Sequence, residues 1–213
     1  MNTLIWVIDS PFSRAVKWLL LKTGMKHSEH LLTWDSLAND PRLAECNPKL
    51  QVPTLIADDE TLTDSLLIIL RLLGHDWHRT VDAQLFRLGD CDFEATLIFL
   101  FRANLLAHKY GRSQESNFMR EAGVATYQKS VDILLDHLVV NTAKIEVNVG
   151  LVLVFSMVLI ARSNAQSDIV RDYRIEELLP FHEALTADLV YQQLAQSYSG
   201  QEGNRWPFFI NYS

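Results

Sequence analysis

The stretch Asn47-Pro48-Lys49-Leu50-Gln51-Val52-Pro53-Thr54-Leu55 decides how the rest of the chain is interpreted. It contains two prolines and runs directly into an apolar segment that ends at Ile56. Because proline donates no ladder hydrogen bond, Pro53 belongs at the start of a strand, and the residue before it, Val52, is held extended. The bond between them can also be cis. The backbone of Val52 is then available to pair with something other than the sheet, unless the segment is only a loop that precedes a strand.

The elements around this stretch alternate between strands and helices. Residues 3–8 form a continuous β-prone run typical of a buried strand, and Ser10-Pro11 begins a helix that ends at Gly24. Residues 30–34 predict a second strand, and 35–46 a short helix within a loop. Residues 54–57 and 61–62 predict a hairpin, and 64–73 a helix. The predicted order is βαβαββα.

The second half of the chain has no convincing strand signal. After a linker at residues 74–80, apolar spacing predicts helices over 81–108, 118–140, 145–161 and 175–195, with Pro180 able to kink or split the last one. The apolar run 149–161 is too short to span a bilayer and indicates a helix buried on all sides. We therefore expect an α/β domain over residues 1–76 and an all-helical domain over 81–213.

Composition limits the function. The chain has 213 residues, of which 48% are hydrophobic, and a net charge of −7 with no basic run, which argues against nucleic acid as a partner. Cys46 and Cys91 are too far apart in sequence to indicate a disulfide framework or a metal site. His75 and His78 lie in the linker, where solvated side chains are more common than metal ligands. The N-terminus does not look like a signal peptide, so we expect a cytoplasmic protein.

The order of elements, with Val52-Pro53-Thr54-Leu55 before the hairpin and Asp64-Ser65 after it, resembles the thioredoxin-like N-terminal domain of glutathione S-transferases. The resemblance covers the chain in order and is most specific over residues 10–65. It implies a transferase that joins the thiolate of glutathione, its co-substrate, to a small electrophile without a metal. It also implies a cis Val52–Pro53 bond and a homodimer, with no nucleic-acid or membrane partner. The alternative is a non-catalytic binding or regulatory protein with the same fold.

Ser10 is the candidate catalytic residue. A hydroxyl at a helix N-terminus can help to hold a thiolate, because the free N–H groups and the helix dipole favour an anion there. An ordinary N-cap is the competing interpretation. The resemblance places a catalytic Ser or Cys at this position and leaves Ser13 as the alternative. Ser10-Pro11-Phe12-Ser13 looks like the Cys-Pro-x-Cys of glutaredoxins with serine in both cysteine positions, which disfavours a thiol-disulfide reductase.

The remaining site residues concern glutathione itself. Asp64 and Ser65 begin a helix and match the ammonium and carboxylate of an α-amino acid head, although both are also common capping residues. By resemblance, Val52 and Pro53 hold the cysteinyl part, and Gln51 lies near the glycyl carboxylate. Leu50 departs from the glycine or polar residue of many relatives. The electrophile is expected near the C-terminal half of 81–108 and the first helix, with 206–209 a further candidate.

One structural motif of the resembled family is incomplete. Asn148 falls where relatives carry the Asp of an N-capping box, but Ile145 stands where its Ser or Thr partner would be. We therefore expect the cap of this helix to come from elsewhere, with Thr142 a candidate.

Overall fold

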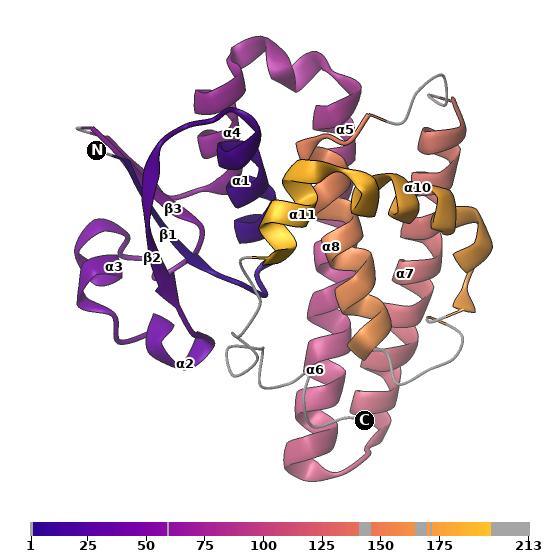
Figure 1. Cartoon of the computed structure of the whole chain (residues 1–213). Coiled ribbons are helices and arrows are strands. Elements are labelled where there is room, and N and C mark those ends of the chain that lie inside the picture. The colour runs from indigo at the N-terminus through magenta and orange to yellow at the C-terminus, as the bar shows by residue number, and fades with distance from the viewer. Residues whose placement is uncertain (1, 59, 141–145, 165–169, 171, 197–213) are drawn as a thin grey trace.

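The computed structural model describes residues 2–58, 60–140, 146–164, 170 and 172–196 (Figure 1). Its N-terminal part contains β1 (Asn2–Val7), α1 (Pro11–Lys22), β2 (His27–Leu32), α2 (Trp34–Leu37), α3 (Pro41–Cys46), β3 (Thr54–Ala57), β4 (Glu60–Leu62) and α4 (Ser65–Leu73). The predicted βαβαββα order is confirmed. The second helical position holds two short helices rather than one, because Thr33 and Asp40 each cap a separate N-terminus.

The sheet has the strand order β2-β1-β3-β4. β1 runs parallel to β2 and antiparallel to β3, with Ile5 opposite Thr54. Successive side chains of β1 point to opposite faces, so Leu4 and Trp6 pack in the core with α1 and α4 while Ile5 packs with α3. Figure 1 shows α1 and α4 on the face of the sheet that meets the helical part.

All regular secondary structure among the described residues of the second part is helical. It contains a 3₁₀ helix (His75–Arg79), α5 (Val81–Arg87), a π-helical segment (Leu88–Phe93), α6 (Glu94–Tyr110), α7 (Gln114–Val140), α8 (Val149–Asn164), α10 (Ile175–Ala187) and α11 (Leu189–Gln196). The fold class, a thioredoxin-like α/β domain followed by a helical domain, is as predicted.

Two helices differ from the prediction. The long helix over 81–108 is interrupted by the π-helical segment, which apolar periodicity does not reveal. The last helix breaks at Asp188 and not at Pro180, which lies inside α10. The backbone of Asp188 is extended and not helical. Its carboxylate accepts a hydrogen bond from the Tyr191 N–H at 2.8 Å and so caps the N-terminus of α11.

α8 is the central helix of the second domain. Of the run 149–161, which was predicted to be buried on all sides, every side chain is buried except that of Leu159, which is 36% exposed. Over the described residues, no helix is both long and apolar enough to cross a membrane. α1 packs against both α8 and α11, and the Trp18 indole donates to the Asp188 carboxylate at 3.2 Å, so α1 joins the two domains.

The N-terminus of α8 is capped from two directions. The Asn148 side chain accepts from the Leu151 N–H at 2.8 Å, and Asp82 of α5 accepts from the Gly150 N–H at 2.6 Å. Trp77 donates to the other Asp82 oxygen at 2.8 Å. The expectation that Asn148 does not itself supply the cap was wrong, and Thr142 lies outside the described residues. Burial raises the pKa of Asp82 despite these hydrogen bonds.

The segment interpreted as a polar linker contributes to the core. Trp77 is only 6% exposed and meets Phe86 edge-on with a centroid separation of 5.7 Å. His75 and His78 lie beside it, and the described residues include no group of His, Cys, Asp and Glu side chains that could hold a metal.

Candidate functional site

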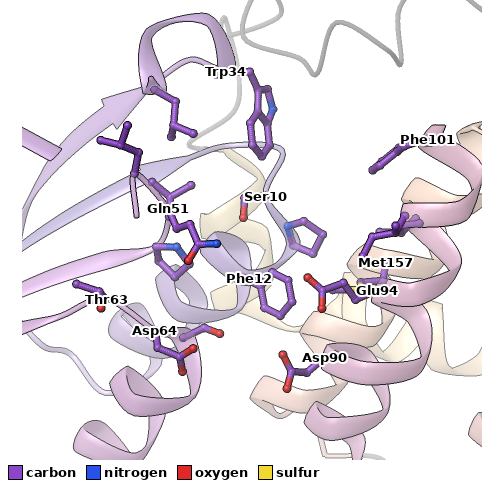
Figure 2. A pocket seen from close by; sticks show the side chains of 18 residues that line it. Ser10, Phe12, Trp34, Gln51, Thr63, Asp64, Asp90, Glu94, Phe101 and Met157 are labelled. Carbon is purple, nitrogen blue, oxygen red and sulfur yellow. The ribbon is translucent and has the colours of Figure 1, made fainter. Parts of the chain in front are cut away.

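A cavity of about 530 Å³ lies between the α/β domain and the helical domain (Figure 2). It brings together all six candidate residues, which are Ser10, Gln51, Val52, Pro53, Asp64 and Ser65. The rest of its lining comes from α1, α2, the turn before β3, the residue before Asp64, the π-helical segment, α6 and α8, and comprises Pro11, Phe12, Trp34, Leu37, Leu50, Thr63, Asp90, Glu94, Leu97, Ile98, Phe101 and Met157.

Ser10 lies at the N-terminus of α1 and is 3% exposed. Its Oγ accepts a hydrogen bond from the Ser13 N–H at 3.2 Å, so it does cap the helix. Capping uses a lone pair of the oxygen and leaves the O–H available as a donor. The loop before it is fixed by Arg14, whose guanidinium donates to the Ile8 carbonyl at 2.8 Å and pairs with Asp9 at 3.2 Å. A capping role and a role as donor to a ligand are therefore compatible.

Ser13, the alternative to Ser10, is fully buried and does not line the cavity. Its hydroxyl has no hydrogen-bond partner among the described residues. Neither Cys46 nor Cys91 lines the cavity either. Of the residues proposed to act on a thiol, only Ser10 has access to the cavity.

The peptide bond between Val52 and Pro53 is cis, as expected. Asn47, 1% exposed, shapes the loop before it. The Asn47 amide donates to the Gln51 carbonyl and to the Thr54 hydroxyl, both at 2.9 Å, and its oxygen accepts from the Lys49 N–H at 3.1 Å. Sequence reasoning missed this role, although a buried Asn that bonds nearby backbone is a common way to fix a turn.

The backbone of Val52 is unpaired in the described part of the chain, since neither its N–H nor its C=O makes a hydrogen bond there. Leu50, two residues earlier, has a φ of 52°. This left-handed conformation costs a residue with a Cβ about 1 kcal/mol, so glycine would adopt it more readily than Leu50 does.

Asp64 and Ser65 lie at the N-terminus of α4, where Asp64 is the N-cap and Ser65 the first helical residue. Asp64 Oδ1 accepts from the N–H groups of Leu66 and Leu67, at 2.9 and 3.2 Å, so Asp64 is an N-cap as one interpretation had it. Its second oxygen makes no further hydrogen bond among the described residues and Ser65 lies beside it. The pair therefore offers a carboxylate oxygen, a hydroxyl and the positive end of a helix dipole to one ligand.

The opposite wall carries two carboxylates that sequence reasoning did not single out. Asp90 lies in the π-helical segment and Glu94 begins α6 one turn later. Burial raises the pKa of Asp90, with the Arg87 guanidinium opposing this and the Asp64 charge adding to it. Burial also raises the pKa of Glu94, and the neighbouring Asp90 raises it further. Their spacing of four residues on a predicted helix was the available signal that they share a face.

The comparisons with known proteins agree with this geometry. Residues 4–76 match the family model described as the glutathione S-transferase N-terminal domain. The match extends over the N-terminal α/β domain and does not include the helical domain. A search of curated proteins found no match.

Solved structures of glutathione S-transferases share the fold over nearly the whole chain. A glutathione S-transferase from Xylella fastidiosa is 16% identical with a TM-score of 0.72, covering 92% of this chain and 98% of its own. One from the Antarctic clam Laternula elliptica is 16% identical with a TM-score of 0.71, and the match covers 100% of this chain and 99% of the clam protein's chain. A glutathione transferase from Burkholderia graminis, with two glutathione molecules bound per subunit, is 17% identical with a TM-score of 0.74. The match covers 93% of this chain and 89% of the Burkholderia graminis chain.

Proposed function

We propose that the protein is a glutathione transferase that joins glutathione to a small electrophile. The observation that carries this proposal is that one cavity gathers the unpaired Val52 backbone and two helix N-termini, one bearing Ser10 and the other Asp64 and Ser65. These features fit a tripeptide with a charged amino-acid head at one end and a thiol between. The glutathione bound to the Burkholderia graminis relative supports the same ligand.

In this proposal glutathione lies along Val52, whose N–H and C=O pair with the cysteinyl unit as an added strand would. The γ-glutamyl carboxylate accepts from the hydroxyl and the backbone N–H of Ser65, and the ammonium group pairs with the second oxygen of Asp64. Gln51 approaches the glycyl end. The cysteinyl sulfur then lies near Ser10, whose O–H and helix dipole favour the thiolate.

The reaction needs little covalent chemistry from the protein. The thiol releases its proton to solvent, the sulfur forms a bond to the electrophilic carbon, and the leaving group departs with its electron pair. The chain contributes positioning of the two reactants and stabilisation of the sulfur anion. No metal is required for this step.

The test of binding is thermal unfolding with and without glutathione. At about 100-fold excess over its dissociation constant, a ligand that binds only the native state adds about 2.7 kcal/mol, which corresponds to a rise in Tm of roughly 5–10 °C for a chain of this size. Asp64→Asn should lose most of this rise, because asparagine still caps α4 but cannot pair with the ammonium group. Asp40→Asn is the control, since Asp40 caps α3 outside the cavity.

The test of turnover is conjugation of chlorodinitrobenzene, followed by absorbance. Release of chloride with formation of the thioether supports the transferase. Binding of glutathione without turnover of any electrophile would favour the alternative, a non-catalytic binding protein. No rise in Tm at millimolar glutathione would refute the transferase and would favour a non-catalytic protein that binds another partner.

A homodimer and a cytoplasmic location remain part of the proposal. We expect α4 and α5 near the two-fold axis, and exposed apolar side chains support this, with Leu67 51%, Leu73 39% and Val81 42% exposed. Sedimentation equilibrium at micromolar concentration should give twice the chain mass of 24.4 kDa. Leu67→Lys should shift the protein toward monomer.

A further inference from the structure

The charged side chains that line the cavity are all acidic. Of the 18 residues that line it, three are carboxylates, Asp64, Asp90 and Glu94, and none is Lys, Arg or His. Asp64 is accounted for by the glutathione ammonium in the proposed function. We call the other two, Asp90 and Glu94, the acidic wall. Figure 2 shows both side chains of the acidic wall projecting from the helical domain into the cavity, with Glu94 pointing toward Phe12.

The two carboxylates are compensated unequally. Asp90 forms an ion pair with Arg87, which lies outside the cavity and also approaches the Cys91 sulfur at 3.0 Å. Glu94 makes neither a hydrogen bond nor an ion pair with any described residue, and its nearest charged neighbour is the like charge of Asp90. Two like charges four residues apart on a helix repel each other. Glu94 is therefore a half-buried carboxylate without a counter-ion among the residues that the structure describes.

The surroundings of Glu94 are those of a cation site. Leu97, Phe101 and Met157 lie on its own side of the cavity, and Phe12 and Trp34 on the side of the α/β domain. Aromatic faces together with a carboxylate bind ammonium groups well, because the ring quadrupole and the negative charge both attract a cation and the apolar lining lowers the dielectric constant around them. A carboxylate-bearing ligand would meet Asp90 and Glu94 as like charges.

We propose that the acidic wall makes this protein select electrophiles that carry a cationic group, with Glu94 as the specificity-determining residue. The inference rests on the proposed function, since it takes the occupant of this part of the cavity to be the second substrate. The cation lies between Glu94 and the ring of Phe12. The electrophilic carbon then faces Ser10 and the sulfur of glutathione across the cavity.

The experiment uses two chloronitrobenzamides that differ only in the amide substituent, a trimethylammonioethyl group in one and the isosteric, uncharged neohexyl group in the other. Their reactivity toward thiolate is matched because the substituent is remote from the chlorine. A second pair without the chlorine cannot react and reports binding alone by calorimetry. Both pairs are measured on the parent, on Glu94→Gln and on Glu121→Gln. The last is the control, because Glu121 is exposed on α7 and does not line the cavity.

The parent should favour the cationic member by roughly tenfold in both kcat/KM and dissociation constant, the scale for one partly exposed charge pair with an aromatic contribution. Glu94→Gln should reduce this ratio to about twofold through Asp90 alone, while Glu121→Gln should keep it. Equal values for the two ligands in the parent, or an unchanged ratio in Glu94→Gln, would overturn the inference.

Failure of the proposed function gives a different pattern. If the chain bound no glutathione and conjugated neither electrophile, the unreactive pair would still measure the cation preference directly. A preference that depends on Glu94 in that case would support cation recognition while refuting conjugation. Normal conjugation of both electrophiles without any preference would refute the inference and leave the proposed function intact.

Discussion

Replacing Gly150 with alanine should separate α8 from α5. A Cβ at this position would lie 2.3 Å from the Asp82 carbonyl oxygen and 2.7 Å from the Phe86 nitrogen, both of them backbone atoms of α5. It would also lie 2.8 Å from the Asp82 carboxylate oxygen that accepts the Gly150 N–H. Because backbone atoms cannot rotate away, the two helices must move apart.

The magnitude follows from three contributions. Overpacking costs roughly 1–3 kcal/mol, and loss of a hydrogen bond to a charged acceptor costs about 1.5–3 kcal/mol. Alanine returns up to about 1 kcal/mol in helix propensity. We expect the free energy of unfolding to fall by about 2–4 kcal/mol, which corresponds to a loss in Tm of roughly 5–15 °C.

Urea unfolding followed by far-UV circular dichroism measures this change, with Gly123→Ala as the matched control. Gly123 is also a buried helical glycine, but its Cβ would meet the Leu100 side chain, with Cδ2 at 2.8 Å and Cγ at 3.0 Å. A leucine side chain can rotate, so we expect Gly123→Ala to change the stability by about 1 kcal/mol or less. Equal destabilisation by the two substitutions would refute the argument that the α5 backbone is the obstacle.

Three further outcomes are expected. Ser10→Ala should leave glutathione affinity almost unchanged and slow conjugation at neutral pH by about a hundredfold. It should also raise the pKa of the bound thiol, which ultraviolet titration of the thiolate measures. An unchanged thiol pKa would remove Ser10 from the mechanism. Asn47→Ala should lower the free energy of unfolding by about 2–3 kcal/mol, since the Gln51 carbonyl and its neighbours lose buried partners, and equal urea midpoints would contradict this. Glu94→Gln should be more stable than the parent near neutral pH, because the pKa of Glu94 is raised in the folded protein and its charged form therefore disfavours folding. The difference in stability should disappear as pH falls through the raised pKa toward the ordinary value of 4.5. A difference in urea midpoint that does not change with pH would contradict this.

The parts of the fold that were predicted correctly depend on local chemistry. Ser10, Gly24 and Asp64 mark helix ends through their own capping and backbone preferences. The continuous β-prone run of residues 3–8 predicts β1, and Pro53 precedes β3 because proline donates no ladder hydrogen bond. The order of the α/β domain followed from these local signals, and the family resemblance then directed attention to six residues that line one cavity. Their roles toward glutathione remain predictions.

The parts that were missed depend on contacts between distant segments. The cap of α8 comes partly from Asp82, which is 68 residues from Gly150 and has no sequence signature that links them. Trp77 looked like a linker residue because its partner, Asp82, becomes buried only when α8 packs on α5. Asp90 and Glu94 were not singled out from the sequence, because only the approach of the α/β domain turns their helical face into a cavity wall.

The two halves of the cavity have separate origins along the chain. The α/β domain contributes the residues around Ser10, Val52 and Asp64, whereas residues 90–101 contribute most of the helical wall in one contiguous segment. In the proposed function, exchange of this one short segment would therefore change the acceptor preference and leave the residues proposed to bind glutathione unaltered. Proteins with this fold that differ in their acceptors would then differ in sequence mainly over one stretch of about a dozen residues.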